Sequence, residues 1–123
     1  MLFRSFGTLA RERATVVIVL PSGLIDTHVE RIAQLALKHR MASVATTSPH
    51  AEGGLLLSYG QNYRAFARKA ATYVDKILRG AKPSELPIEQ PTILELAINL
   101  VTARQLGLTI PPELLLRADR VIE

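Results

Sequence analysis

The sequence has no cysteine among its 123 residues. This absence excludes disulfide bonds, a thiol nucleophile and a thiolate metal site, and it leaves the redox state of the compartment open. Long apolar runs are absent too, because the longest lie at 16–21 and 53–57. A membrane-spanning helix needs about 20 apolar residues, so the sequence predicts no transmembrane segment. Too little apolar sequence follows the first four residues for a secretory signal, so we expect no signal peptide in this sequence.

Residue patterns typical of catalysis are equally scarce. The three histidines are scattered over different predicted elements without metal-ligand spacing, and only His50, which lies in a predicted loop, is of interest. No serine is flanked by the two glycines of a nucleophile elbow, and no phosphate-binding glycine loop occurs. Asp26 and Glu30 are explained by a helix N-terminus, where negative charge is favourable. The sequence therefore predicts no enzyme activity.

The composition is that of one globular domain. A chain of 123 residues can form a single core but is short for two ordinary domains. Hydrophobic residues make up 48% and charged residues 21%, which argues against disorder. The formal net charge of +4 comes from basic residues scattered among acidic ones, without the basic stripe that nucleic-acid binding needs. We therefore expect no nucleic-acid partner.

The first half of the sequence predicts a βαβ unit. A short helical period precedes the apolar run at 15–20, which lacks polar alternation and is typical of a parallel strand buried on both faces. Thr27 and Glu30 have the spacing of a capping box, which predicts the start of a helix. Residues 41–46 then supply a second strand. Strand, helix and strand in this order predict a parallel sheet flanked by helices, and hence the α/β fold class.

Two strand-end loops of this unit are candidate ligand-contacting segments. In open parallel sheets, ligands bind beyond the carboxyl ends of the strands. The first loop consists of Pro21, Ser22 and Gly23, and the second begins with Thr46 and Thr47. We expect these segments to lie next to each other at one edge of the sheet.

The stretch 53–80 contains the longest predicted helix. Residues 49–54 have the composition of a loop, and residues 55–58 are a third candidate strand. A long amphipathic helix should then begin after Asn62, a good N-cap, and end at Gly80, which suits a left-handed C-terminal residue. We expect the apolar stripe of this helix, Tyr63 included, to be buried.

Ser58 and Tyr59 stand between the third strand and this helix. A serine at a strand end commonly bonds local backbone groups, and no base lies beside Ser58 in the sequence. Tyr59 lies outside the helical period and joins an apolar ring to a hydroxyl group, which suits a small-molecule pocket. Ligand contact and ordinary packing both remain open for Tyr59.

The last third of the sequence begins with an extended connector. Three prolines at 82–91 can neither continue a helix nor pair centrally in a sheet. Residues 93–98 have a strand-like apolar pattern, and Asn99 can cap a short helix that ends at Gly107. The proline pair at 111–112 can begin a last helix, because a first-turn residue needs no amide donor.

Several motifs in fixed order resemble one known family. They read GGLLLSYG at 53–60, ATYVDKILRGAKP at 71–83, LPIEQPT at 86–92, ELAINL at 95–100, ARQLGLTIP at 103–111 and RADRVIE at 117–123. This series resembles the carboxyl-terminal part of ABC-transporter substrate-binding proteins of the tryptophan/tyrosine type. The resemblance covers the chain from about Phe6 onward, and a series in fixed order is far more specific than any single motif.

The resemblance implies a type I periplasmic-binding-protein-like fold. Two Rossmann-like α/β lobes joined by crossing strands close there on a small solute. By resemblance, residues 1–48 correspond to the end of the second lobe, 49–92 to a crossing segment and a helix of the first lobe, and 93–123 to the carboxyl-terminal return. Family members are much longer than this chain, so we expect it to be a fragment of such a protein.

The implied function is that of the solute-binding component of an ABC-type importer, without catalysis and without a cofactor. The implied partners are a small solute, such as an amino acid, and the permease subunits, reached through the full-length protein. The implied location is periplasmic or otherwise extracytoplasmic. By position, the resemblance assigns ligand contacts to Pro21, Ser22, Gly23, Thr46, Thr47, Ser58 and Tyr59.

One departure from the family pattern bears on the ligand. Many relatives carry an aspartate in the first two of these segments, where it meets the amino group of the ligand. This chain has Ser22 and Thr47 near those positions instead. The departure argues against an amino-acid ligand.

Two further expectations concern assembly and an alternative function. A sheet without its first lobe leaves apolar faces bare, so we expect the isolated chain to form a homo-oligomer, with a swap of the segment 53–80 as one route. The alternative function is a ligand-sensing domain of a regulatory protein with the same fold, which would need an attached effector domain. A small flavodoxin-like protein is a third alternative, although no phosphate loop is present.

Overall fold

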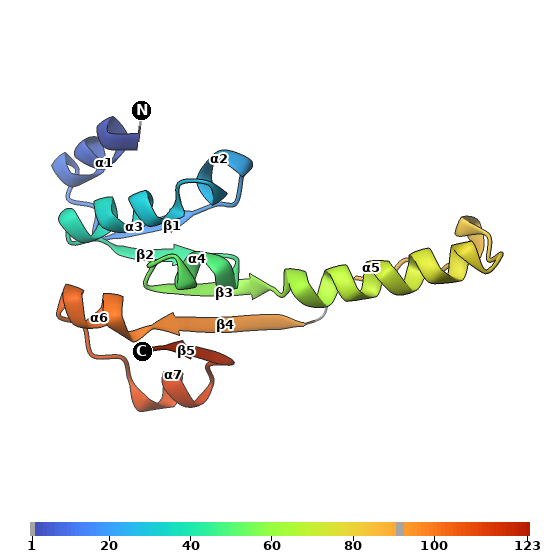
Figure 1. The fold of residues 1–123 in the computed structure, drawn as a ribbon. Coiled ribbons are helices and arrows are strands. Elements are labelled where there is room, and N and C mark those ends of the chain that lie inside the picture. Colours follow the sequence, from blue (N-terminus) through green and yellow to red (C-terminus); the bar gives the residue numbers. More distant parts are fainter. Residues whose placement is uncertain (1, 91–92) are drawn as a thin grey trace.

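A computed structural model describes residues 2–90 and 93–123 of the chain, and Figure 1 shows a mixed sheet from which one long helix projects. The sheet has the order β1-β2-β3-β4-β5. Its strands are β1 (Val16–Val19), β2 (Ala42–Ala45), β3 (Leu57–Gln61), β4 (Leu94–Asn99) and β5 (Arg120–Ile122). Neighbouring strands are parallel except β3 and β4, which are antiparallel. The α/β prediction is confirmed, with one antiparallel pair in an otherwise parallel sheet.

The helices mostly connect these strands. They are α1 (Leu2–Arg11), α2 (Gly23–Asp26), α3 (Val29–Lys38), α4 (Ser48–Glu52), α5 (Tyr63–Leu78), α6 (Leu100–Leu106) and α7 (Pro112–Leu116), with a short 3₁₀ helix η1 (Pro83–Glu85). None of the helices in the described residues is long and apolar enough to cross a bilayer.

The predicted βαβ unit is formed by β1, α3 and β2. The two strands pair in register from Val16 opposite Ala42 to Val19 opposite Ala45. The capping-box prediction for the start of α3 is wrong. The hydroxyl of Thr27 donates instead to backbone carbonyls of the preceding turn, at 3.0 and 3.1 Å, and so closes α2 rather than opening α3.

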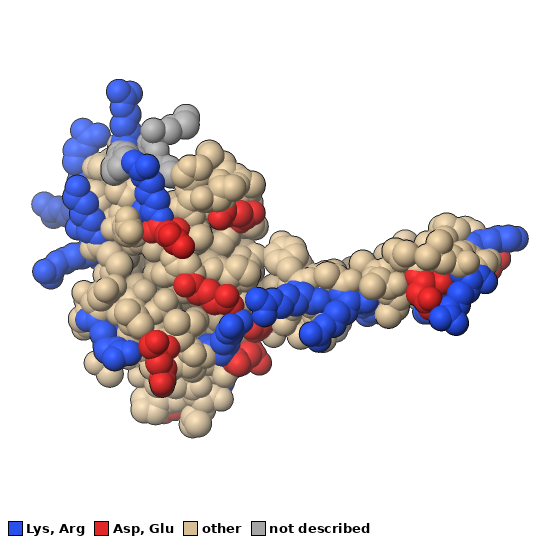
Figure 2. Space-filling view, in the orientation of Figure 1, with Lys and Arg blue, Asp and Glu red and all other residues tan. Residues whose placement is uncertain are grey.

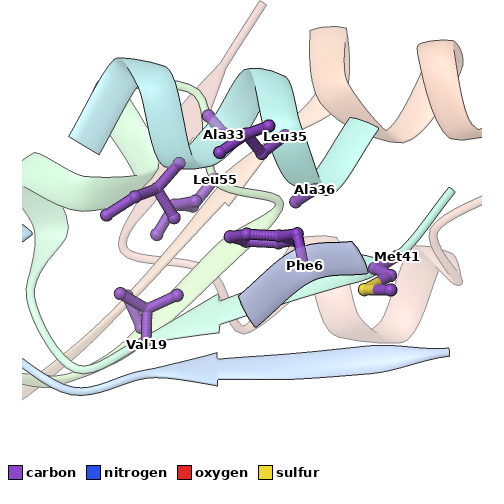
Figure 3. Close-up of a cluster of buried hydrophobic side chains, with 9 residues drawn as sticks. Phe6, Val19, Ala33, Leu35, Ala36, Met41 and Leu55 are labelled. Carbon is purple, nitrogen blue, oxygen red and sulfur yellow. The ribbon is translucent and has the colours of Figure 1, made fainter. Parts of the chain in front are cut away.

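The core lies between this part of the sheet and helices α1 and α3. Figure 3 shows side chains from α1, α3, β1 and the segment before β3 meeting in one cluster. Its buried members are Phe6, Val19, Ile32, Ala33, Leu35, Ala36, Met41, Ala45 and Leu55. Only one face of β1 takes part. Side chains alternate between the two faces of a strand, and Val16 and Ile18, on the other face, are 53% and 67% exposed. The prediction that β1 is buried on both faces is therefore wrong.

The segment between β2 and β3 differs from its prediction. Residues 49–54 were expected to form a loop, but Ser48–Glu52 form helix α4. Pro49 fits its first turn, where a missing amide donor costs nothing. The third strand begins two residues later than predicted and ends at Gln61, so that it includes Gly60. There the backbone passes so close to β2 that a Cβ on Gly60 would lie 2.0 Å from the carbonyl oxygen of Thr46.

Both predicted ends of helix α5 are confirmed, but the predicted burial of its apolar stripe is wrong. Asn62 Oδ1 accepts the N-cap bond from the Ala65 amide at 2.9 Å, and Gly80 has a left-handed φ of 100°. No residue of α5 is buried, however, and Tyr63 is 53% exposed. The helix extends past the edge of the sheet as an arm, so its apolar stripe has no sheet face to cover (Figure 1).

The connector after α5 returns along the same arm. The hydroxyl of Tyr73 donates to the carbonyl oxygen of Pro87 at 2.7 Å, and Lys69 forms an ion pair with Glu89. Lysine and arginine side chains follow the lower side of the arm in Figure 2, whereas its upper side in that view is largely uncharged. The last residue of the predicted connector, Pro91, lies outside the described residues.

The carboxyl-terminal third completes the sheet. Strand β4 leads directly into α6, where Asn99 Oδ1 accepts from the Thr102 amide at 3.0 Å, and α6 ends at Gly107 with a φ of 73°. Both features confirm the predictions. Helix α7 also begins at the predicted proline pair. Strand β5, which pairs in parallel with β4, was not predicted.

Candidate functional site

A depression of about 220 Å³ lies beyond the carboxyl ends of β1 and β2. These strands are parallel neighbours, so their ends meet at one edge of the sheet. The lining comes from the segments that follow each strand and from the first residue of the arm. Its residues are Pro21, Asp26, Val29, Thr47, Pro49, His50 and Tyr63.

Local structure explains how Asp26 reaches this depression. Ser22 begins a single helical turn after β1, since its Oγ accepts from the Ile25 amide at 3.3 Å and its carbonyl oxygen accepts from the Asp26 amide at 2.8 Å. This turn, α2, carries the carboxylate of Asp26 to the rim of the depression. Ser22 thus caps the helical turn that carries Asp26, and it is not among the residues that line the depression.

His50 comes from the other strand end. It lies in α4, which starts directly after Thr47, and its side chain is only 4% exposed. Its Nε2 lies 2.7 Å from Asp26 Oδ1, a contact between residues 24 positions apart that joins α4 to α2. An ionised carboxylate can only accept hydrogen bonds, so Nε2–H donates to Asp26. The Nδ1 atom of His50 is buried and has no hydrogen-bond partner among the described residues.

The exposures of the two partners differ. The Asp26 side chain is 54% exposed, whereas His50 lies beneath it. No lysine or arginine is among the described residues that line the depression, and the other lining side chains are mostly apolar. The site therefore presents one carboxylate, fixed from below by an imidazole, at the edge of an apolar wall.

A second, smaller depression adjoins the first and shares Pro49 and Tyr63 with it. It is lined by charges of both signs, because Glu52 and Arg120 form an ion pair there and Arg64 and Glu95 lie beside them. Tyr63, at the base of the arm, thus separates an acidic site from one of mixed charge.

Two of the predicted site residues, Pro21 and Thr47, line the first depression. Gly23 is the first residue of α2 beside it. Thr46 packs its carbonyl oxygen close to Gly60, at the junction of β2 and β3. The structure thus brings the two predicted strand-end loops together at one edge of the sheet.

The other two predicted residues lie on β3, away from this depression. Ser58 is completely buried between β2 and β4, and its hydroxyl has no hydrogen-bond partner in the described part of the chain. Tyr59 points outward and is 56% exposed. It stands opposite Leu96 on the antiparallel pair that leads into the arm.

Sequence reasoning missed Asp26 and Tyr63 as lining residues and left His50 in a loop. Asp26 was assigned to a helix dipole, and Tyr63 to the core. The proline after Ser48 was the available signal for α4, since proline is common in the first turn of a helix. No sequence signal joins Asp26 to His50, because only the pairing of β1 with β2 brings their following segments together.

The described residues contain no group of three or more metal-ligating side chains placed to hold an ion. A model of the ABC transporter substrate binding protein family matches residues 5–122, nearly the whole chain. The chain belongs to this family. A comparison with curated proteins found no match.

Solved structures support the assignment of the fold. A conserved domain protein from Vibrio cholerae O1 biovar El Tor is 27% identical, with a TM-score of 0.85. The L-Trp complex of an ABC domain from Streptococcus pneumoniae is 20% identical, with a TM-score of 0.87. A ligand-free, open substrate-binding protein with adhesive properties from Clostridium difficile is 21% identical, with a TM-score of 0.70.

The family member described here is short compared with these structures. In all three comparisons 98% of this chain is covered, but only 40%, 40% and 41% of the Vibrio, Clostridium and Streptococcus chains. The chain thus spans about two fifths of the length of the proteins that it resembles.

Proposed function

We propose that this chain is the solute-contacting part of the binding component of an ABC-type importer, and that it binds a small solute without catalysis. The observation that carries the proposal is the depression beyond β1 and β2 in a member of a substrate-binding family. Its apolar wall with a few convergent polar groups is typical of small-molecule sites. Because the similar Streptococcus domain was solved with L-Trp, amino acids are the first solutes to test.

The strand directions support a division between two lobes. We assign residues 1–48 to the end of one lobe, 49–92 to the crossing segment and a helix of the other lobe, and 93–123 to the return. Strands β3 and β4 run antiparallel into and out of the arm, as a chain that leaves a lobe and returns must do. The absence of any buried residue in α5 is consistent with an arm that belongs to the other lobe.

The proposed partners follow from this role. A full-length protein that contains this segment would deliver the solute to the permease subunits of the transporter, in the periplasm or elsewhere outside the cytoplasm. The segment itself would supply one side of the solute site.

A thermal-shift screen over amino acids, purines and small carboxylates tests the proposal. A solute that binds only the folded chain raises the unfolding midpoint, by an amount that grows with the ratio of its concentration to the Kd. Thr47→Val should reduce the shift, because Thr47 lines the depression. The same substitution at Thr8, on α1, should leave the shift unchanged. A screen in which no solute raises the midpoint would contradict the proposal.

We also propose that the isolated chain self-associates. Ile18 on the edge strand and Leu78 at the far end of the arm are both large, apolar and well exposed. Sizing with light scattering should give a mass above that of the monomer that rises with concentration. Ile18→Lys should reduce this mass if two copies pair through the edge of the sheet. Leu78→Lys should reduce the mass if the arm is exchanged between copies. A monomeric mass at all concentrations would overturn this expectation.

A further inference from the structure

Two helices are followed by an arginine at the position where two others have glycine. At Arg13 and Arg40 the backbone is left-handed, with φ angles of 58° and 54°. Gly80 and Gly107 hold the same position after α5 and α6. In all four turns, the next amide donates to the carbonyl oxygen five positions earlier, at distances between 2.8 and 3.0 Å. A left-handed backbone is unfavourable for a residue with a Cβ, so both arginines are kept at a conformational cost.

The helix dipole does not explain these two arginines. A positive charge near the carboxyl end of a helix is favourable. Helix α6 meets this need with Arg104 in its last turn and still ends on Gly107. Helices α1 and α3 also carry a basic residue in their last turns. The side chains of Arg13 and Arg40 therefore add positive charge beyond what the helices need.

Both arginines lie at the same end of the sheet. Arg13 precedes β1 and Arg40 precedes β2, and these two strands are parallel neighbours. The rings of Phe6 on α1 and His39 at the end of α3 are stacked there, with centroids 6.3 Å apart. Figure 2 shows lysine and arginine side chains gathered over α1 and the adjoining end of α3. We call this patch the basic end, and its members are Arg4, Arg11, Arg13, Lys38 and Arg40.

The charge of the basic end is not neutralised by neighbouring acids. All five side chains are exposed, and none forms an ion pair with a described residue. The segments 2–14 and 37–41 contain these five basic residues and one acidic residue, Glu12, which leaves a formal charge of +4. On the arm, by contrast, three basic side chains are paired with acids of the arm itself. Folding thus gathers basic residues that are scattered in the sequence into one unbalanced patch.

The arrangement of the basic end suits an extended anionic surface. Its side chains line neither the depressions beyond the strands nor those along the arm. They come from two helices and two turns, so they can meet charges spread over an area. Phe6, the aromatic residue of α1 whose side chain is described, is 4% exposed and stacked on His39, and it offers no open ring to nucleic-acid bases. Clusters of four to eight basic residues bind anionic lipid surfaces.

We propose that the basic end binds the anionic headgroup surface of a phospholipid membrane through charge. This inference rests in part on the proposed function, because a component of an importer works at a membrane. The basic end lies at the amino ends of β1 and β2, and the depression lies beyond their carboxyl ends. A chain bound in this way directs the depression away from the lipid, where it stays open to solute.

Co-sedimentation with vesicles tests the proposal. The 123-residue chain is mixed, at one low concentration, with vesicles of phosphatidylcholine alone or of equal parts phosphatidylcholine and phosphatidylglycerol. We expect binding to the anionic vesicles only. Binding should fall steeply between about 10 mM and about 150 mM salt, because the screening length falls from about 30 Å to about 8 Å. Equal binding to both kinds of vesicle, or no binding to either, would overturn the proposal.

Glycine substitutions remove the charge of the two turns without weakening the fold. Arg13→Gly combined with Arg40→Gly should lower the vesicle partition coefficient about 25-fold, since each basic residue near the lipid contributes about fivefold. The thermal unfolding midpoint of this variant should be unchanged or higher, because glycine suits a left-handed turn. A lower midpoint would show that the arginines serve the fold, and would overturn the argument for an outside partner.

A matched variant on the arm separates the patch from the net charge. Arg68→Gln combined with Lys76→Gln removes the same charge from exposed positions of α5 and should lower the partition coefficient less than about fivefold. Equal losses in the two double variants would show that only net charge matters, and the proposal would fail.

A short DNA duplex tests the competing class of partner. Binding of the duplex at about 150 mM salt, without binding to the anionic vesicles at about 10 mM, would assign the basic end to a nucleic acid and overturn the proposal. The solute screen is a separate measurement. Loss of vesicle binding with an intact thermal shift would leave the proposed function standing, whereas vesicle binding without any thermal shift would remove that function and keep the membrane surface.

Discussion

Two buried serines on neighbouring strands should respond differently to the same substitution, because only one of them has a hydrogen-bond partner among the described residues. Ser43 on β2 and Ser58 on β3 are 1% and 0% exposed, in strands that pair directly. Ser43 Oγ accepts a hydrogen bond from the Leu56 amide at 3.0 Å. The hydroxyl of Ser58 has no hydrogen-bond partner in the described residues. Replacement by alanine removes only a hydroxyl group in each case.

The magnitudes follow from these bonds. Ser43→Ala leaves the Leu56 amide buried without an acceptor, which costs about 1–3 kcal/mol of folding free energy. Ser58→Ala removes a buried polar group that gains nothing in return, so its effect should range from zero to a stabilisation of about 1 kcal/mol. For a domain of this size, 1 kcal/mol shifts Tm by about 4 °C.

Urea unfolding followed by circular dichroism measures both changes, with equal m-values as the check that the denatured state is unaltered. One low protein concentration should be used throughout, because association adds apparent stability. A clear loss of stability in Ser58→Ala would show that this hydroxyl has a partner, and would refute the reasoning. The same variant tests the ligand contact that the family resemblance assigns to Ser58. Unchanged solute affinity would remove Ser58 from the site.

Three other predictions rest on equally local geometry. Gly60→Ala places a Cβ 2.0 Å from the carbonyl oxygen of Thr46, so it should lower the free energy of unfolding by about 3 kcal/mol or more in thermal unfolding. Gly7→Ala lies in a helix with open space around it and should raise the same free energy by about 0.5–1 kcal/mol. Asn99→Ala loses both the cap of α6 and a bond to a buried carbonyl, about 2 kcal/mol in all, against about 1 kcal/mol for Asn62→Ala, which loses a cap alone. Amides of α5 should exchange with solvent far faster than those of β2 and β3 in the monomer. A 16-residue helix that has no buried residue and contacts only its own connector is marginal in water. Equal protection of the arm and the sheet would contradict this last expectation.

The features that could be predicted from sequence are those set by local chemistry. Asn62 and Gly80 mark the two ends of α5 because a cap oxygen and a left-handed glycine act within one turn of the helix. The βαβ unit follows for the same reason, from apolar runs and short connections. The rule that ligands bind beyond strand ends predicts that the segments of Pro21 and Thr47 lie at one edge of the sheet, and both residues line the same depression there.

The errors arise where several local signals compete. Thr27 had the spacing of a capping box, but its hydroxyl bonds backward to carbonyls, a use of threonine that is equally favourable. Pro49 looked like a loop residue because proline both breaks helices and begins them. Sequence spacing alone cannot decide between such uses, since each satisfies the same groups.

Burial is set by the neighbours of an element and not by its own pattern. The apolar period of α5 correctly predicts a helix with one apolar face, yet none of its residues is buried, since the arm extends beyond the sheet. The same holds for β1, whose outer face carries exposed Ile18. An apolar stripe indicates that an element packs against another surface, but it does not identify that surface. The described part of the chain leaves the stripes of α5 and of the outer face of β1 largely exposed.

The candidate site depends both on the order of the strands and on the local signals that begin two short helices. Strand order determines that the segments after β1 and β2 meet, but the 2.7 Å contact between Asp26 and His50 depends on two short helices that sequence reasoning did not find. Each helix is too short to have a hydrophobic period, so its detection would have required reading Ser22 and Pro49 as helix starts. The lining of this depression thus includes Asp26 and His50, which lie beyond the strand-end loops, and a comparison confined to those loops would overlook both residues.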